Sequence, residues 1–353
     1  MDVIIRGEGE KTIVELMKAL QEGPDLMDQV LGITYRKGNC IKSNPTRPPI
    51  LGLDSLPFPA FNLLPMEKYR LHPPFGRRTP AMPIITSRGC PYRCIFCSKS
   101  VFGKKYRANS PSYVVDEILF LKQKFGIEEI KFYDDSFTLD RKRIFEICRL
   151  LKKEKIDIEW TCETRVNLVD SDLLSVMKDA GCYMIEYGVE SGVQEILCNL
   201  KKDITLKETV EAFDSTHKLG IETVAYFMLG APEETVETIS KTIEFAKKLD
   251  PDFAQFSILT PLPGTELFDL AFGDGMTIDD WGEYVYADLN SLCYAGFGSK
   301  FMDREELGAW NKRAYLDFYL RWSYFVKRLR KTRSLGELRT NLSGLNMLLQ
   351  SVK

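Results

Sequence analysis

The chain has 353 residues, of which 44% are apolar, so it is long enough to bury the core of one large domain with appendages. Its 48 basic and 50 acidic residues give a formal net charge of −2, which argues against a general nucleic-acid or membrane-surface footprint. Apolar runs reach only about five residues, far below the ~20 that a membrane span needs, and no signal-peptide pattern opens the sequence. Nine cysteines, an odd number, fit a reducing cytoplasm better than a disulfide framework, so we expect no disulfides.

Residues 1–45 are expected to form a small unit that starts in the middle of a fold. A strand at 2–5 leads into the motif Gly7-Glu8-Gly9-Glu10 and a helical pattern, and a hairpin follows at 30–42. Glu8 and Glu10 have a plain structural interpretation, because carboxylates at a helix start stabilise its dipole. Residues 46–83 read as a proline-rich linker, since ten of the seventeen prolines lie between Pro45 and Pro83.

The cysteines Cys90, Cys94 and Cys97 follow a short apolar run that reads as a strand. Thiolates are soft ligands, and three of them in one tight loop favour a thiophilic metal centre. Zinc is the weaker interpretation, because structural zinc needs a fourth Cys or His and no second paired cluster is found. A [4Fe–4S] cluster on three thiolates would leave one iron open to another ligand, which indicates chemistry rather than scaffolding.

Strand and helix patterns alternate from residue 84 to residue 265, the expected core. Strands are expected at 82–86, 127–134, 156–162, 183–189, 222–229 and 253–259, and helices at 111–125, 141–155, 170–181, 194–199, 206–220 and 233–249. This alternation predicts an α/β fold whose six parallel strands, joined by right-handed crossovers, curl into a partial (β/α)6 TIM-like barrel. Polar residues and glycines follow each strand, at the end where parallel barrels carry their chemistry.

At residues 90–97 the sequence resembles the radical S-adenosylmethionine (radical SAM) superfamily, whose signature is CxxxCxΦC with an aromatic Φ, here Phe96. The resemblance implies that the three cysteines hold a [4Fe–4S] cluster and that the amino and carboxylate groups of SAM chelate its open iron. It implies that electron transfer, from an external flavodoxin- or ferredoxin-type donor, cleaves SAM to a 5′-deoxyadenosyl radical that attacks a small-molecule substrate.

The resemblance also assigns residues to the SAM amino acid moiety. Asp134 and Asp135 occupy the place of the family's Gly-Gly-Glu motif, which meets the amino group, and Arg165 lies where relatives place a basic residue on the carboxylate. Each has an alternative interpretation. An aspartate pair after a strand is often a helix cap, and an arginine is often one half of a surface ion pair.

Further residues are assigned to the nucleoside. Glu190 and Ser191 correspond to contacts with the ribose hydroxyls, and Gly230 and Glu233 belong to a partial match to the pattern GxIxGxxE beside adenine, from which the first glycine is missing. Glu233 follows Pro232 at an expected helix start, so its alternative role is to stabilise the helix dipole. The remaining core-region cysteines are interpreted as packed thiols: Cys148, Cys162, Cys182 and Cys198.

The segment 1–61 is similar to the link between a cobalamin-binding domain and the radical SAM core in one branch of the superfamily. That domain's body, with its Asp-x-His-x-x-Gly motif, is expected upstream of Met1, and neither His72 nor His217 lies in such a motif. The resemblance therefore implies cobalamin as a possible cofactor of a full-length protein, whereas cobalamin binding by this chain alone is not expected.

Beyond residue 265 the alternation stops. Residues 266–353 are expected to form an irregular cap around Trp281, Tyr284 and Tyr286 and then one long aromatic helix at 303–330, which either packs on the open side of the sheet or stacks against substrate. The basic run at 327–331 reads as a solvated helix end, so no nucleic-acid partner is expected.

The sequence thus predicts a cytoplasmic radical SAM enzyme that methylates, cyclises or rearranges an unidentified small molecule. Two alternatives stay open: a radical SAM enzyme that modifies tRNA or protein without cobalamin, and a non-catalytic metal-binding remnant.

Overall fold

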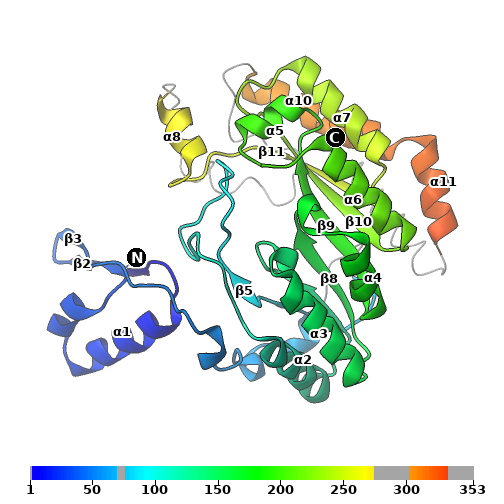
Figure 1. Cartoon of the computed structure of the whole chain (residues 1–353). Helices are drawn as coiled ribbons and strands as arrows, with labels where there is room; N and C mark the ends of the chain where they lie inside the picture. The colour runs from blue at the N-terminus through cyan, green and yellow to red at the C-terminus, as the bar shows by residue number, and fades with distance from the viewer. Residues whose placement is uncertain (1, 70–75, 274–301, 333–353) are drawn as a thin grey trace.

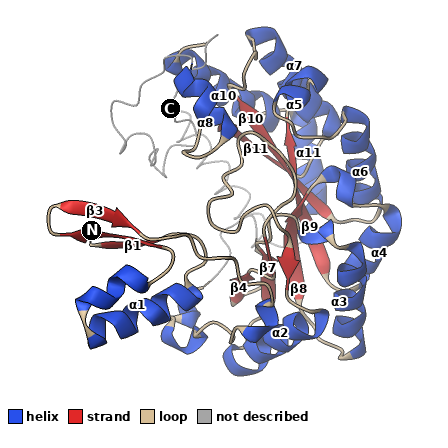
Figure 2. Cartoon of the chain, turned by 60° about the vertical axis from the view of Figure 1, so that its left-hand side comes forward, coloured by secondary structure: helices blue, strands red, loops and turns tan. Residues whose placement is uncertain are grey.

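The computed structural model describes residues 2–69, 76–273 and 302–332 (Figure 1). Its centre is a six-stranded sheet in the order β11-β10-β9-β8-β7-β4, with every neighbouring pair parallel. The strands are β4 (Ala81–Ile84), β7 (Glu129–Phe132), β8 (Glu159–Thr164), β9 (Cys182–Glu190), β10 (Glu222–Leu229) and β11 (Phe253–Ile258). Because each strand lies beside the next one in the chain, right-handed crossovers put the connecting helices on one face. The predicted α/β partial barrel is confirmed, and Figure 2 shows the helices along the outer, convex side of the curved sheet.

The crossover helices begin where the sequence supplies a capping side chain. Ser110, Asp140, Asp170, Thr205 and Thr235 each accept a hydrogen bond from a backbone N–H in the first turn that follows. The helices are α2 (Pro111–Phe125), α3 (Arg141–Lys153), α4 (Ser171–Asp179), the short α5 (Gln194–Asn199), α6 (Leu206–Lys218) and α7 (Val236–Leu249).

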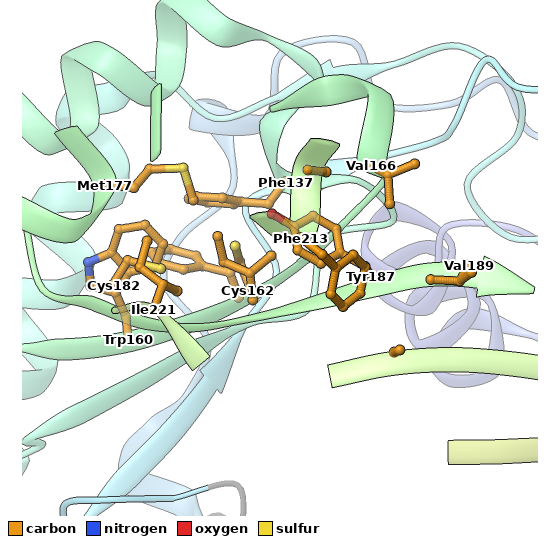
Figure 3. Close-up of a cluster of buried hydrophobic side chains, with 14 of the residues drawn as sticks. Phe137, Trp160, Cys162, Val166, Met177, Cys182, Tyr187, Val189, Phe213 and Ile221 are labelled. Atoms are coloured by element: carbon orange, nitrogen blue, oxygen red, sulfur yellow. The ribbon is translucent and has the colours of Figure 1, made fainter. Parts of the chain in front are cut away.

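The core lies between the convex face of the sheet and these helices. Its aromatic side chains are interlocked: the rings of Phe132 and Phe137 stack at 4.3 Å between centroids, and Trp160 donates from Nε1 to the carbonyl of Ala180 at 2.8 Å. Figure 3 shows part of this core, in which Trp160, Cys162, Cys182 and Tyr187 come from neighbouring strands. Apolar residues alternate along each strand to reach this face, so the residues between them point to the concave side.

The packed-thiol prediction is confirmed for three of its four members. Cys148, Cys162 and Cys182 are buried, whereas Cys198 is exposed and the prediction is wrong there. Cys198 lies on α5, whose buried residues are Ile196 and Leu197, so its side chain points away from the packed face. The eight cysteines in the described part of the chain are all free.

The N-terminal unit is a three-stranded antiparallel sheet, β1 (Val3–Ile5), β2 (Ile33–Lys37) and β3 (Cys40–Ser43), with α1 (Glu10–Glu22) packed against it. It lies apart from the half-barrel in Figure 1, where it is drawn in blue. The linker that follows contains three short 3₁₀ turns, and from it Phe61 and Met66 insert into the main core.

Three helices in the described residues follow the last strand: α8 (Glu266–Gly273), α10 (Arg304–Tyr319) and α11 (Trp322–Lys331). The predicted single helix at 303–330 is wrong, because the chain turns at Leu320 and Arg321. The Arg321 side chain holds this turn by donating to the carbonyls of Phe318 and Lys247, both at 2.8 Å. The predicted cap at 281–286 lies outside the described residues.

Helix α10 covers the outer edge of β11. The hydroxyl of Tyr319 accepts from the N–H of Ala254 at 3.0 Å and donates to its carbonyl at 2.8 Å, and the hydroxyl of Tyr315 accepts from the N–H of Phe256 at 3.2 Å. These tyrosines satisfy an edge strand that would otherwise expose its backbone. The packing role weighed for the aromatic helix is therefore the one observed. No helix in the described ranges combines the length and the apolar character that crossing a bilayer requires.

Candidate metal and cofactor site at the strand ends

The cysteines lie on a long loop, residues 89–106, which we call the cysteine loop. A two-stranded ribbon closes it at its base, where β5 (Ser87–Arg88) pairs with β6 (Arg107–Ala108). At its far end, Ile95 donates its N–H to the carbonyl of Leu200 at 3.1 Å and accepts from the N–H of Leu267 at 3.0 Å. Ile95 is also buried among Ile196, Leu200 and Leu267. In Figure 1 the loop, drawn in cyan, runs from β5 towards α5 and α8.

Two of the three thiols are in direct contact. Cys94 and Cys97 share a hydrogen bond, which lowers the pKa of Cys94 to about 6 and raises that of Cys97 well above its usual value. Lys202 and Arg165 lower the pKa of Cys94 further. Burial raises the pKa of Cys90, although the Tyr92 N–H and Lys99 act in the opposite direction. One thiolate thus forms readily in this loop, and the cations beside it compensate its charge.

Arg165 is buried against the cysteine loop. Its Nη1 lies 3.6 Å from Sγ of Cys94, and its guanidinium lies 3.6 Å from the ring centroid of Tyr92. It also donates to the carbonyls of Lys202 and Asp203. With an exposed fraction of 4%, it is no surface ion pair.

The two predicted aspartates have different surroundings. Asp134 is buried and accepts hydrogen bonds from the N–H groups of Thr86 and Ser87, at 2.5 and 2.9 Å, so it fixes the chain just before the cysteine loop. Asp135 is exposed and accepts from the N–H of Gly89. Of the pair, Asp135 is thus the carboxylate available to a ligand next to Cys90.

At the end of β9, Glu190 forms a buried ion pair with Lys202, with Oε1 and Nζ 2.5 Å apart. Gly188 makes room for this pair, because a Cβ at that position would lie 2.5 Å from the Glu190 carboxylate and 2.7 Å from Nζ of Lys202. Both charges act on Cys97. Ser191 points away from the thiols, because its hydroxyl bonds Thr242 on α7 at 3.1 Å.

The loop after β10 contains two glutamates with opposite roles. Glu233 is exposed, with a φ of +63°, whereas Glu234 is fully buried and accepts from the N–H groups of Gly230 and Ala231 at 2.6 and 3.1 Å. Burial raises the pKa of Glu234 to about 7. Its Oε1 is buried without a hydrogen-bond partner. Glu234 therefore shapes the backbone loop that Gly230 opens.

Charged side chains continue from the loop onto the concave face of the sheet. Lys131 lies 2.7 Å from Glu186 and 3.3 Å from Glu163, and Tyr226 donates a hydrogen bond to Glu186. Burial, and then the negative charge of the neighbouring Glu186, raises the pKa of Glu163. The charge of Asp135 acts in the same direction. We call Lys131, Glu163, Glu186 and Tyr226 the inner-face cluster.

Comparison with known proteins identifies the family. The model of the Radical SAM superfamily matches residues 84–246, from β4 into α7. Over 330 residues, the chain is 38% identical to the uncharacterized methyltransferase PH0819 of Pyrococcus horikoshii, an overlap that covers 93% of this chain and 69% of that protein. The chain belongs to the radical SAM superfamily.

Two further similarities are with longer proteins. The chain is 34% identical to the anaerobic magnesium-protoporphyrin IX monomethyl ester cyclase of Rubrivivax gelatinosus, over 81% of this chain and 52% of the cyclase. The solved structure of OxsB, a cobalamin-dependent S-adenosylmethionine radical enzyme with aqua-cobalamin and S-adenosylmethionine bound, superposes with a TM-score of 0.70 at 20% identity. The match covers 99% of this chain and 55% of that one, so the shared fold includes the N-terminal unit. The chain spans about half the length of these two proteins.

Radical SAM proteins use a [4Fe–4S] cluster and SAM, and the chemistry of the thiols present suits the cluster. Three thiols on one loop, two of them in contact and flanked by Arg165 and Lys202, form a soft and charge-compensated donor set. Within the described ranges, no three His, Cys, Asp or Glu side chains are arranged around a single metal ion.

Sequence reasoning missed two buried charged residues that follow β9 and β10, Lys202 and Glu234. Lys202 follows the exposed Lys201, and nothing in the sequence distinguishes the two lysines. Glu234 follows Glu233 in the same way. The capping Thr235 was the available signal, because it sets the start of α7 and leaves Glu234 in the preceding turn.

Proposed function

We propose that this chain is the catalytic part of a radical SAM enzyme in which Cys90, Cys94 and Cys97 hold the [4Fe–4S] cluster. The observation that carries the proposal is the hydrogen-bonded pair of thiols, Cys94 and Cys97, beside the strand ends and next to Arg165. When bound, the cluster supplies the electron that cleaves SAM into methionine and a 5′-deoxyadenosyl radical, which abstracts hydrogen from the substrate.

The chain's own residues would stabilise and orient these groups. Arg165 is engaged by Cys94 and by backbone carbonyls, so its role in the proposal is to compensate thiolate charge. Its contact with the SAM carboxylate stays a prediction from the sequence. Asp135 is exposed beside Gly89, which suits it to accept the ammonium group of SAM. The Glu190–Lys202 pair, for which Gly188 leaves room, would border the ribose.

Methyl transfer to a small molecule is the reaction class that we favour. The relative that is 38% identical to this chain is named a methyltransferase, and the aligned region covers 93% of this chain. Ring closure is the second candidate, because the Rubrivivax relative is named a cyclase. The inner-face cluster would contact the substrate, since Glu163 and Tyr226 are only partly buried on the concave side.

We further propose a cytoplasmic location and an external flavodoxin- or ferredoxin-type electron donor. A cluster held by thiolates needs a reducing compartment, and the cysteines of the described ranges are all free thiols. Lowering the ionic strength in a titration with a flavodoxin should strengthen binding if opposite charges guide the encounter.

The test is anaerobic cluster reconstitution followed by reduction in the presence of SAM. The wild type should release 5′-deoxyadenosine, whereas Cys94→Ala should release none above background. Cys40→Ala is the matched control, because Cys40 is an exposed thiol on β3 of the N-terminal unit. An iron-loaded wild type that leaves SAM intact would refute the proposal.

A further inference from the structure

The Gly7-Glu8-Gly9-Glu10 motif contacts the base of the cysteine loop, about eighty residues further along the chain. A Cβ on Gly7 would lie 3.9 Å from the carbonyl oxygen of Val101, which is part of that loop. Glu8 and Arg107 form an ion pair, with Oε1 and Nη1 2.5 Å apart and both side chains 3% exposed. The motif is therefore more than the start of α1, the role that its sequence suggests.

This ion pair joins three separate segments of the chain. Arg107 also donates to the carbonyls of Ile50 at 2.7 Å and Phe102 at 2.8 Å, and the second oxygen of Glu8 accepts from the N–H of Ile50 at 2.6 Å. The N-terminal unit, the linker and the cysteine loop thus meet at one guanidinium. Removing one partner of a buried ion pair leaves an uncompensated buried charge, so the three segments are held together as long as both charges are present.

A second arginine extends the contact to the start of the cysteine loop. Arg88 bonds Glu10 through Nη2 and lies 3.7 Å from Glu8 through Nη1, and its guanidinium stands over the ring of Phe102. Arg88 directly precedes Gly89, whose α-carbon is so close to the returning end of the loop that a Cβ would lie 2.4 Å from the carbonyl oxygen of Lys105. Movement of Arg88 would therefore move Gly89 and Cys90.

We propose that Glu8, Glu10, Arg88 and Arg107 form a latch by which the N-terminal unit positions the cysteine loop for its cluster. The four are positioning residues, because they act through Gly89 and Cys90. The inference rests on the proposed function for its meaning, but the latch itself is a property of the chain without cofactors. Two carboxylates face two guanidinium groups, so the latch is charge-balanced and each carboxylate substitution leaves one cation uncompensated.

The experiment compares Glu8→Gln and Glu10→Gln with the wild type, using the full chain. Glu15→Gln is the matched control, because Glu15 pairs with Arg47 at the surface of the same unit and does not touch the loop. Backbone hydrogen exchange is measured first, without cofactors. We expect amides between residues 88 and 108 to exchange about tenfold faster in Glu8→Gln, less so in Glu10→Gln, and unchanged in the control.

Iron per chain and the electron paramagnetic resonance (EPR) spectrum of the reduced cluster are then measured after reconstitution. We expect Glu8→Gln to retain about half of the wild-type iron and to show a changed spectrum, which a loss of stability elsewhere in the chain would not produce. If Glu8→Gln does not fold, Glu10→Gln decides, because it leaves the Glu8–Arg107 pair in place.

The proposal would be overturned if both latch variants matched Glu15→Gln in amide hydrogen exchange and in the EPR spectrum of the reduced cluster. A wild type that binds no iron would instead refute the proposed function. The exchange measurement on the cofactor-free chain would still test the latch in that case.

Discussion

At the scale of single residues, the site depends on close approaches that only a few side chains permit. Gly89 has a φ of +84°, which favours glycine. It also has no space for a Cβ, which would lie 2.4 Å from the carbonyl oxygen of Lys105. Gly103 has a similar φ of +73°, but a Cβ at that position would have no neighbouring atom within 4 Å. Replacing Gly103 therefore tests the cost of backbone strain alone, whereas replacing Gly89 adds a steric clash to the same strain.

We expect Gly89→Ala to lower the iron bound per chain by about fivefold, because the added methyl group displaces Lys105 and with it the base of the loop. Gly103→Ala should cost only the strain of a left-handed residue, about 1 kcal/mol, and keep its iron. Iron analysis and thermal unfolding of both variants check this. Equal iron contents would show that the close contact at Gly89 does not matter.

Glu117 on α2 is buried, and among the described residues it has no ion-pair partner. Burial, and then the charge of Asp134, raises the pKa of Glu117 from its ordinary 4.5 to about 7. Between these values the folded state binds more protons than the unfolded state, so the free energy of unfolding falls as the pH rises from 4.5 through 7. Above pH 7 the full penalty of the buried charge is present.

Glu117→Gln should therefore stabilise the chain at pH 8, by about 2 kcal/mol, and have a much smaller effect at pH 5. Chemical denaturation at the two pH values measures this difference. The neighbouring Asp116→Asn, at an exposed position on the same helix, is the control and should change neither value. A stability gain of equal size at both pH values would mean that the charge of Glu117 is not the cause.

The sequence points to the three candidate cluster cysteines far more clearly than to the residues around them. Three cysteines at fixed spacing identify themselves, because few other patterns place thiols in one turn. By contrast, Asp134 and Asp135 differ only in the face of the chain on which they lie, and the structure buries one and exposes the other. Adjacent identical residues, such as Lys201 and Lys202, cannot be separated without knowing which one the fold turns inward.

At the scale of elements, the cysteine loop is held at both ends. Its base is the ribbon of β5 and β6, and its far end is Ile95, packed among residues of α5 and α8. The ribbon was not predicted, because two residues in each strand have no periodicity to detect. The six long strands were predicted, since buried parallel strands read as separate apolar runs between helices.

Ile95→Ala should destabilise the chain by about 2–4 kcal/mol, because Ile95 is 3% exposed and its removal leaves a cavity between α5 and the loop. It should also weaken iron retention, since Cys94 is the adjacent residue. Ile85→Ala is the control, at an isoleucine that is 49% exposed on the other side of the loop's base. Thermal unfolding measures the loss of stability, and iron analysis measures the loss of iron. A variant that is as stable as the wild type would contradict the expected loss of stability, whatever its iron content.

The turn between α10 and α11 shows why helix ends are hard to predict. The aromatic pattern continues through Leu320 and Arg321 without interruption, so the sequence reads as one helix. Tertiary contacts of Arg321 with Lys247 and Asp250, on and after α7, fix the turn. Those contacts depend on the position of α7, which local sequence does not contain.

At the scale of the whole molecule, the half-barrel separates two chemical environments. Its convex face is apolar and carries the helices, while its concave face carries the inner-face cluster and leads up to the cysteine loop (Figure 2). The N-terminal unit contacts the base of that same loop through the latch. Both parts of the chain therefore converge on the three cysteines.

The central claim is that these cysteines leave one iron open for SAM. The most direct test is the EPR spectrum of the reduced, reconstituted wild type, recorded with and without SAM. We expect about four irons per chain and a spectrum that changes when SAM is added, because SAM would bind the open iron. One zinc per chain, or an iron cluster whose spectrum is the same with and without SAM, would contradict the account.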